Sequence, residues 1–236
     1  MSRAGAVISF PGNGDDGSGY LATPPSGAGP GLVVIQEWWG LVPQIEDMVD
    51  RFAAAGFVVL APDLYRGTRV SNAEPDEAAK QMMALDIGRA ARDMVGAVDA
   101  LAARDDVTGS GIGVVGFCMG GGLALWLASL RPGVVTAVAP FYGVLPWPDA
   151  QPDYAAITAR VQGHYAELDD FASPAAVAEL ETSLRGAGVD VVDMFIEPGV
   201  GHAFMNHTRP EAYDEATAER AWGRVLAFLH EELDAP

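Results

Sequence analysis

The sequence predicts an α/β fold with a mostly parallel central sheet, helices on both faces of the sheet and an N-terminal β-hairpin. Short apolar runs alternate with helical patterns along the chain, as expected when crossover helices join parallel strands. Half of the 236 residues are hydrophobic and only 19% are charged, so the chain can bury a sizeable core. At about 150 residues per domain, this length fits one large α/β domain over residues 1–236.

The N-terminal part predicts a hairpin and then two interior strands separated by a helix. Residues 6–10 and 20–23 flank a turn rich in Gly and Asp, which favours a hairpin. Residues 32–36 form a continuous apolar run, typical of a parallel strand that is covered on both faces. Pro43 begins a helix that reaches about residue 55, with apolar side chains at core spacing, and residues 57–61 form the next buried strand.

The rest of the chain continues this alternation. A polar loop leads into a long helical region at residues 74–103. Ser173 followed by Pro174 begins another helix, and Thr-Arg-Pro-Glu at residues 208–211 has the capping-box pattern for a C-terminal helix that reaches about residue 232. The other expected elements are strands at 112–117, 134–140, 155–162 and 189–196, a helix at 120–130 and a Trp/Pro loop at 145–153.

Charge and hydropathy exclude several classes of partner. The formal charge of −18 repels phosphate backbones and anionic lipid headgroups, so we expect neither nucleic acid nor a membrane surface as partner. Residues 111–130 carry no charge and are long enough to span a bilayer, but their six glycines favour a strand, a turn and a helix instead. Residues 1–12 hold no apolar run of signal-peptide length, and we expect no export signal.

Cys118 is the one cysteine of the chain, which excludes an intrachain disulfide and a thiolate metal cluster. A reducing compartment, the cytoplasm, is therefore expected. No histidine pair has the spacing of metal ligands on one helix face, and we expect neither a metal nor another cofactor. The sequence leaves a monomer and a dimer equally open.

Residues 113–122 carry the strongest chemical signal, because they contain Gly-x-Cys-x-Gly where a buried strand meets a helix. This is the nucleophile-elbow pattern with cysteine in place of serine. The glycines two positions before and after Cys118 let strand and helix approach closely. The helix N-terminus favours a thiolate on Cys118, and the N–H of Met119 is placed to receive an oxyanion. The alternative is that Cys118 is a small buried hydrophobic residue.

A thiol nucleophile needs a base, for which histidine is the usual residue. His202 lies in a loop with several glycines after the last strand, and the carboxyl ends of parallel strands bring that loop to the same sheet edge as Cys118. We rank it above the other histidines, because His230 lies in the terminal helix, His164 ends a strand and His207 precedes the last helix.

The residue that orients the histidine is expected after the strand at 155–162. Asp169 is our candidate, and Glu167 and Asp170 are adjacent rivals. The resulting order of nucleophile, acid and histidine along the chain is the one expected for an α/β-hydrolase fold.

The segment Gln-Glu-Trp-Trp-Gly at residues 36–40 directly follows the first interior strand, where such folds place the second oxyanion donor. The backbone N–H of Trp38 is the candidate donor. Glu37 lies beside bulky aromatic residues, and desolvation there would raise its pKa and let it hold or accept a proton from Cys118. The alternative is that Glu37 is a solvent-facing loop acid.

These residues together resemble the dienelactone hydrolase (carboxymethylenebutenolidase) family, the α/β-hydrolases that use cysteine in the elbow. The resemblance implies a triad of Cys118, His202 and Asp169, with Glu37 holding the resting thiol. It also implies an oxyanion hole from the backbone N–H groups of Trp38 and Met119, and an acyl-thioester that is hydrolysed by water. The resemblance covers nearly the whole chain and rests on the N-terminal hairpin and the segments at 36–40, 61–65, 116–121, 141–143, 169 and 201–204.

The substrate-binding positions depart from the family. Members that cleave dienelactone bind the substrate carboxylate with arginines, one shortly after the catalytic histidine and one in the long helical region. Asn206 stands four residues after His202, and residues 74–80 contain no arginine, so we expect a different ester or lactone. The basic residues that could substitute are Arg66, Arg69, Lys80 and Arg209. The expected substrate-contacting residues are Trp39, Tyr142, Trp147, Phe204 and Asn206, with Trp38 and Met205 as further apolar candidates.

The expected activity is hydrolysis of a small carboxylic ester or lactone, without a metal, through a cysteine acyl-enzyme. A catalytically weak α/β-hydrolase that binds a small molecule as a receptor or carrier is the first alternative, and turnover separates the two. A thiol redox sensor is the second alternative. Reversible loss of alkylation at Cys118 after mild peroxide, without ester cleavage, would indicate it.

Overall fold

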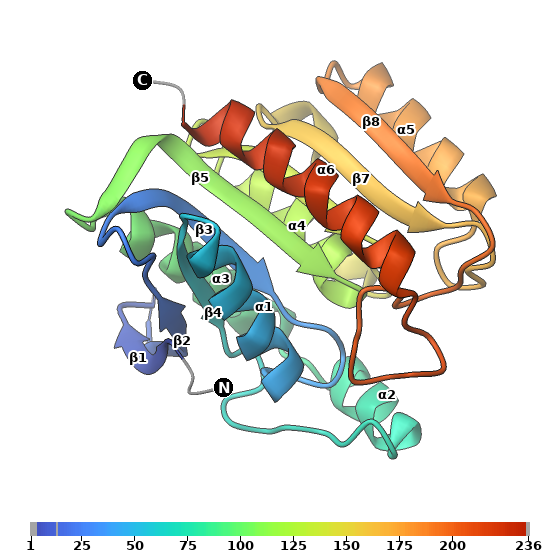
Figure 1. The fold of residues 1–236 in the computed structure, drawn as a ribbon, viewed down its shortest axis with the longest axis horizontal. Helices are drawn as coiled ribbons and strands as arrows, with labels where there is room; N and C mark the ends of the chain where they lie inside the picture. Colours follow the sequence, from blue (N-terminus) through green and yellow to red (C-terminus); the bar gives the residue numbers. More distant parts are fainter. Residues whose placement is uncertain (1–3, 13, 235–236) are drawn as a thin grey trace.

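The computed structural model of the protein describes residues 4–12 and 14–234, in which the strands form one sheet. The strands are β1 (Ala6–Phe10), β2 (Gly17–Ala22), β3 (Gly29–Ile35), β4 (Val58–Pro62), β5 (Val107–Phe117), β6 (Val135–Phe141), β7 (Arg160–Ala166) and β8 (Val191–Glu197). Their order across the sheet is β1-β2-β4-β3-β5-β6-β7-β8 (Figure 1). The β1–β2 and β2–β4 pairs are antiparallel and the others are parallel, so the predicted mostly parallel sheet with an N-terminal hairpin is confirmed.

Helices cover both faces of this sheet, as predicted (Figure 1). The helices are α1 (Pro43–Ala54), α2 (Pro75–Met83), α3 (Ile87–Ala102), α4 (Met119–Leu130), α5 (Pro174–Gly186) and α6 (Glu215–Leu233), with short 3₁₀ turns η1 (Pro148–Ala150) and η2 (Tyr154–Ala156). The apolar sides of α1 and α6 form one core layer, which includes Phe52 and Val225. Those of α3 and α4 form the layer on the opposite face, which includes Met94 and Leu123. Every residue of β3 is buried between the two layers, as expected for an interior parallel strand.

Several expected elements have different bounds in the structure; the strand expected at 112–117, for example, begins at Val107. The long helical region at 74–103 is divided into α2 and α3, because the Asp86 side chain accepts the Arg89 N–H at 2.9 Å and caps a new helix. The strand expected at 155–162 begins later, at Arg160, and runs to Ala166, while residues 154–156 form a 3₁₀ turn. His164 therefore lies within β7 rather than at the end of a strand.

The C-terminal helix also begins later than its predicted cap. Asp214 caps α6 by accepting the Thr217 N–H at 2.9 Å, so the capping-box interpretation of residues 208–211 is wrong. Thr208 instead donates its hydroxyl to Asn206 Oδ1 at 2.7 Å and belongs to the preceding loop. A Ser/Thr-x-x-Glu pattern has this ambiguity, because hydroxyl side chains form hydrogen bonds within loops as readily as at helix ends.

The uncharged stretch at 111–130 is shared between the end of β5 and helix α4, as the glycine content predicts. In residues 4–12 and 14–234, no helix is long and apolar enough to cross a bilayer. The interpretation of residues 1–12 as lacking an export signal includes residues 1–3, which lie outside the described residues.

The topology brings four loops to one edge of the sheet. Strands β3, β5, β7 and β8 are parallel to one another, so their carboxyl ends point the same way. The candidate residues follow these ends: Glu37 and Trp38 after β3, Cys118 after β5, Asp169 after β7 and His202 after β8. In open α/β sheets this edge is where ligands bind.

Candidate active site

Cys118 occupies a strained turn between β5 and α4. Its φ of 55° and ψ of −123° lie in a region that side chains rarely adopt. Backbone hydrogen bonds from both sides hold it there. The Cys118 N–H donates to Phe141 O at 3.1 Å, while its carbonyl accepts from Gly121 and Val144 at 2.9 and 3.1 Å. Strain that the surroundings enforce in this way is typical of functional sites.

The two flanking glycines are required by packing. A Cβ on Gly116 would lie 1.9 Å from Gly120 O, and a Cβ on Gly120 would lie 2.5 Å from both Ile35 O and Gln36 O. Real side chains do not approach backbone this closely, so only glycine lets α4 start directly against β3 and β5. Met119 is the first residue of α4, and its N–H therefore has no carbonyl one turn earlier within the helix.

Asp169 and His202 form a close pair behind the elbow. His202 Nδ1 lies 2.7 Å from Asp169 Oδ2, while Asp169 Oδ1 accepts the N–H groups of Phe171 and Ala172 at 2.8 and 3.0 Å. Burial opposes ionisation of Asp169, but the hydrogen bond and charge of His202 outweigh it and lower the pKa of this carboxyl. Asp169 is therefore a fixed carboxylate in contact with the imidazole of His202.

His202 and Cys118 line the same cavity. Burial disfavours a charged imidazole here, yet the hydrogen bonds to Asp169 and Cys118 and the charges of both groups raise the pKa of His202. A raised pKa means that His202 takes up a proton readily. The structure therefore places Cys118 and His202 on one cavity and joins His202 to Asp169.

The other acids that could orient His202 are engaged elsewhere. Glu167 is exposed and accepts the Gly199 N–H at 2.8 Å, and Asp170 is also exposed. Asp169 alone of the three adjacent acids contacts His202 in the described structure.

The three other histidines lie away from the elbow. His164 is fully buried in β7 and stacks on Phe141, and burial lowers its pKa to about 3. His207 pairs with Asp47 at 3.4 Å and His230 pairs with Asp234 at 2.8 Å, both on the surface.

Glu37 is buried rather than facing solvent, with 1% of its surface exposed. Its two oxygens accept hydrogen bonds from Tyr142 Oη at 3.2 Å and from Asn206 Nδ2 at 2.8 Å. Burial raises the pKa of Glu37, and the His202 charge, the two hydrogen bonds and Arg209 offset this only partly. The predicted contact of Glu37 with the resting thiol is not among the hydrogen bonds of the described residues, although Glu37 and Cys118 line the same cavity.

Glu37→Gln is expected to stabilise the protein at alkaline pH but not at acidic pH. The folded-state pKa of Glu37 lies above its ordinary value of 4.5, so its ionisation costs more in the folded than in the unfolded chain. Below pH 4.5 both states hold the proton and the two proteins should be equally stable. As pH rises through the folded-state pKa, the wild type loses stability relative to the variant.

Urea denaturation of both proteins from pH 4 to pH 9 measures this difference. Glu179→Gln is the matched control, since Glu179 is exposed on α5, and its effect should not change with pH. A Glu37→Gln protein that is less stable than the wild type at pH 9 would mean that His202 and Arg209 compensate fully for burial of the carboxylate.

The elbow opens into a cavity of 290 Å³. Its wall includes Cys118, His202, Glu37 and Trp38, four of the residues expected at the catalytic centre. The other lining residues are Pro75, Met82, Val144, Phe171, Ala203 and Arg209. Pro75 and Met82 come from α2, so the helical excursion between β4 and β5 closes one side of the site.

None of the five expected substrate-contacting residues lines this cavity. Tyr142 and Asn206 support Glu37 from behind, and Phe204 packs in the core against Tyr142. Trp39 is 1% exposed, and Trp147 lies in the core layer on the opposite face of the sheet. Large aromatic side chains are more often buried in the core than placed on the wall of a small pocket that contains polar groups. Their residue type alone therefore did not predict where they lie.

Of the four basic residues considered as substitutes, the structure brings Arg209 to the cavity. Its guanidinium lies 5.7 Å from the Trp39 ring centroid, and Nε donates to Glu211 at 2.8 Å. Arg66 and Arg69 are bound by Asp93 and Glu46, and Lys80 pairs with Glu77 on the surface.

No pattern in the sequence marks Met82, Val144 or Phe171 as wall residues. Phe171 follows Asp169 by two residues in the same loop, and this exposed aromatic beside the candidate acid is the signal that could have been used. In residues 4–12 and 14–234 no group of three His, Cys, Asp or Glu side chains could hold a metal ion.

The parallel sheet, the strained elbow after β5 and the acid and histidine loops at the same edge define an α/β-hydrolase. Residues 18–233 match the model of the dienelactone hydrolase family, and the chain belongs to that family. The predicted family, and with it a hydrolase of the ester- and lactone-cleaving kind, is confirmed.

Individual relatives agree with this assignment over nearly their whole length. The chain is 38% identical over 238 residues to Protein usf of Aquifex pyrophilus, covering 97% of this chain and 99% of that protein. It is 34% identical over 236 residues to an Aquifex aeolicus protein whose name proposes a carboxymethylenebutenolidase, covering 95% and 97%. A Klebsiella pneumoniae crystal structure, described as a proposed dienelactone hydrolase, superposes with a TM-score of 0.82 at 26% identity, covering 96% and 99%.

Proposed function

We propose that this protein hydrolyses small carboxylic esters or lactones through a thioester on Cys118, with His202 as general base and acid and Asp169 as the residue that orients His202. The observation that carries the proposal is the grouping of these three side chains. Cys118 lies on the strained elbow and lines the same cavity as His202, whose Nδ1 is 2.7 Å from Asp169 Oδ2.

Acylation begins when His202 accepts the thiol proton and Cys118 attacks the substrate carbonyl carbon. The carbonyl oxygen becomes an oxyanion, which the N–H groups of Trp38 and Met119 are proposed to bind. The intermediate collapses when His202 returns the proton to the leaving oxygen, so that an alcohol departs and a thioester remains on Cys118. In a lactone, the alcohol stays attached to the acyl group.

Deacylation repeats the sequence with water. His202 takes one proton from a water molecule, whose oxygen attacks the thioester carbon, and the thiolate of Cys118 leaves and is reprotonated by His202. The products are a carboxylic acid and the free enzyme. Raising the pKa of His202, as its contacts with Asp169 and Cys118 do, favours the imidazolium that forms in both halves.

Glu37 and Arg209 set the charge around this centre. Burial raises the pKa of Glu37, so this carboxyl group on the cavity wall holds a proton more readily than an exposed glutamate does. Arg209 supplies a positive charge on the cavity wall, which suits a substrate with a carboxylate or another electron-rich substituent. A cytoplasmic location fits the reduced thiol on which the mechanism depends.

Rapid acid quenching of a p-nitrophenyl acetate reaction should trap one acetyl group per chain, detected by intact-protein mass spectrometry. Peptide mapping should find the group on the peptide that contains Cys118, because a thioester is the proposed intermediate. Neutral hydroxylamine should remove it, as expected for a thioester.

The alternatives give different results in the same experiment. A small-molecule carrier would release p-nitrophenol no faster than buffer, and a redox sensor would lose thiol alkylation reversibly after peroxide without cleaving the ester. An acetyl group on a different residue would overturn the assignment of Cys118. Retained activity in a chelator would dismiss a zinc enzyme.

A further inference from the structure

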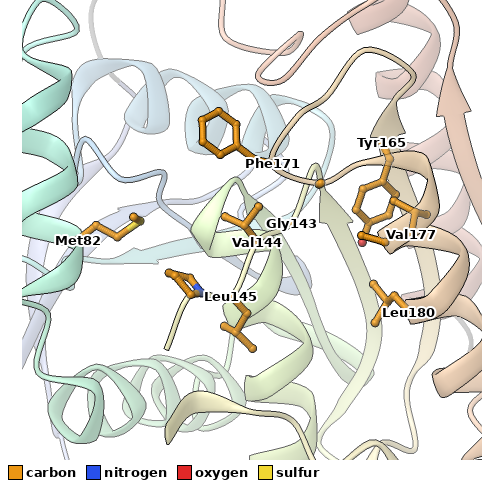
Figure 2. A pocket seen from close by; sticks show the side chains of 11 residues that line it. Met82, Gly143, Val144, Leu145, Tyr165, Phe171, Val177 and Leu180 are labelled. Atoms are coloured by element: carbon orange, nitrogen blue, oxygen red, sulfur yellow. The ribbon is translucent and has the colours of Figure 1, made fainter. Parts of the chain in front are cut away.

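A second cavity, of 460 Å³, adjoins the one that contains Cys118 and His202. It lies between the loop that follows β6 and helix α5, and Figure 2 shows the side chains that line it. Met82, Val144 and Phe171 line both cavities, so these three side chains form the wall shared between them.

The wall of the second cavity is mostly apolar. Figure 2 shows Met82 and Phe171 on the side of the cavity away from Tyr165, Val177 and Leu180. Because Met82 and Phe171 also border the catalytic cavity, the other three mark the distal end. A volume of 460 Å³ lies within the range of about 300–1,000 Å³ that is usual for small-molecule sites.

The shared wall leaves one large aromatic side chain uncovered. Phe171 is 70% exposed, the largest exposure of the large apolar residues in the described chain, while Met82 and Val144 are partly buried. Because the Phe171 ring lines both cavities, it offers apolar contact surface to a ligand in either one. An apolar substituent that entered the second cavity would cover this ring.

Tyr165 supplies one polar group at the distal end. The residue is 1% exposed, and its hydroxyl has no hydrogen-bond partner among the described residues. Burial raises the pKa of this hydroxyl, so it remains protonated and able to donate. A buried hydroxyl without a partner is costly, and an acceptor atom on a ligand would remove that cost.

The position of His202 decides which part of a substrate faces this cavity. In the proposed mechanism His202 returns a proton to the leaving oxygen, so the alcohol part of the ester must lie beside His202. The Phe171 ring centroid lies 5.2 Å from that of His202, and Phe171 lines both cavities. The path from the leaving oxygen past Phe171 therefore leads into the second cavity.

We propose that the second cavity binds the alcohol part of the substrate, an apolar aryl or alkyl group that carries a hydrogen-bond acceptor for the Tyr165 hydroxyl. The inference rests on the proposed function, because it takes the leaving group to lie at His202. It assigns substrate selection to residues that lie outside the catalytic line of Cys118, His202 and Asp169.

Three acetate esters with different alcohol parts test the proposal: phenyl acetate, 2-naphthyl acetate and 6-methoxy-2-naphthyl acetate. The two naphthols are leaving groups of similar reactivity, and the methoxy oxygen is the acceptor for Tyr165. In the wild type, kcat/KM should rise from phenyl to naphthyl and again to methoxynaphthyl. A parallel series of p-nitrophenyl esters with longer acyl chains varies the acyl part instead.

Ala176→Trp fills the cavity from the exposed N-terminal turn of α5. We expect it to lower the ratio of kcat/KM for 6-methoxy-2-naphthyl acetate over phenyl acetate by about tenfold or more. Ala175→Trp is the matched control, since Ala175 is exposed on the same turn but does not line the cavity, and it should leave the ratio unchanged. Tyr165→Phe should lower the preference for methoxynaphthyl over naphthyl by about 3- to 10-fold, the worth of one hydrogen bond.

The outcomes separate this proposal from the proposed function. Equal effects of Ala176→Trp on phenyl and methoxynaphthyl acetate, or an effect confined to the acyl series, would overturn the assignment of the cavity to the alcohol part while ester hydrolysis stands. If the wild type cleaves none of the esters, the hydrolase proposal fails, and binding of 6-methoxy-2-naphthol then decides the cavity. A Kd that Ala176→Trp leaves unchanged would overturn the cavity assignment, and a Kd raised about tenfold would support it.

Discussion

Cys118→Ala is expected to lower kcat/KM for p-nitrophenyl acetate by about 10⁴-fold or more and to abolish the burst of p-nitrophenol. In the proposed mechanism the Cys118 thiolate forms the covalent bond, and the sequence holds no second thiol that could replace it. The residual activity should be that of an ordered cavity with an oxyanion hole, which positions water but has no nucleophile. Stopped-flow absorbance of both proteins measures burst and turnover together.

The same result should follow without a mutation. Cys118 is the one cysteine in the sequence, so iodoacetamide can alkylate no other thiol. Inactivation should track incorporation of a single carboxamidomethyl group, and bound acetate ester should protect against it. Activity that survives full alkylation, in a protein whose thermal unfolding is unchanged, would rule out Cys118 as the nucleophile.

The elbow was predictable from sequence because its constraints come from backbone that lies directly against it. Gly116 and Gly120 are separated from Cys118 by a single residue each. A Cβ on Gly116 would meet the Gly120 carbonyl in the same turn, and a Cβ on Gly120 would meet the end of the neighbouring strand β3. The strained φ of Cys118 follows from the same geometry. A short motif can carry a whole local structure when backbone contacts alone determine it.

The choice among Glu167, Asp169 and Asp170 depends on structure rather than pattern. All three lie in one loop after β7, and the sheet topology brings that loop to the correct edge. Asp169 faces His202 because the N–H groups of Phe171 and Ala172 hold its other oxygen. No periodicity in the sequence encodes which of three adjacent carboxylates turns inward.

The walls of the two cavities depend on packing between segments that are far apart in the sequence, so sequence patterns predict these walls least well. Met82 reaches the site from α2 and Phe171 from the loop after β7, so their proximity is a property of the assembled fold. The aromatic residues that we expected to contact substrate, such as Trp147 and Phe204, lie in the core. Burial of large apolar side chains stabilises the fold, so an aromatic residue type does not by itself indicate a substrate contact. Catalytic residues are tied to strand ends, whereas substrate contacts are not.

Backbone strain and the candidate catalytic groups occur together in this protein. Among the described residues, four that are not glycine have φ in the left-handed region, and three of them are Cys118, Tyr142 and Ala203. Tyr142 bonds to Glu37, and Ala203 follows His202 directly in the chain. The strain of each turn must be offset by the packed sheet beneath it, so the rigid core and the geometry of the site are linked.

Asp169→Asn is expected to lower kcat/KM by about 10²- to 10⁴-fold while leaving the fold intact. The carboxylate accepts the Nδ1 proton at 2.7 Å and leaves the other ring nitrogen free to take the proton of Cys118. An asparagine amide removes the negative charge that stabilises the imidazolium, and its NH₂ group can favour the wrong tautomer. The pKa of His202 should fall in the variant, because Asp169 is one of the groups that raise it.

Asp170→Asn is the matched control. It removes the same charge at the next position along the chain, where the side chain is exposed. Its pH profile and kcat/KM should stay within about twofold of the wild type, because screened surface charges have small effects. A titration of His202 by NMR in the three proteins completes the experiment. If Asp169→Asn and Asp170→Asn reduced activity equally, the loop charge as a whole would matter, and the 2.7 Å contact would have no special role in orienting His202. If only Asp169→Asn lowers both the rate and the pKa of His202, the buried carboxylate acts through the imidazole, as its geometry requires.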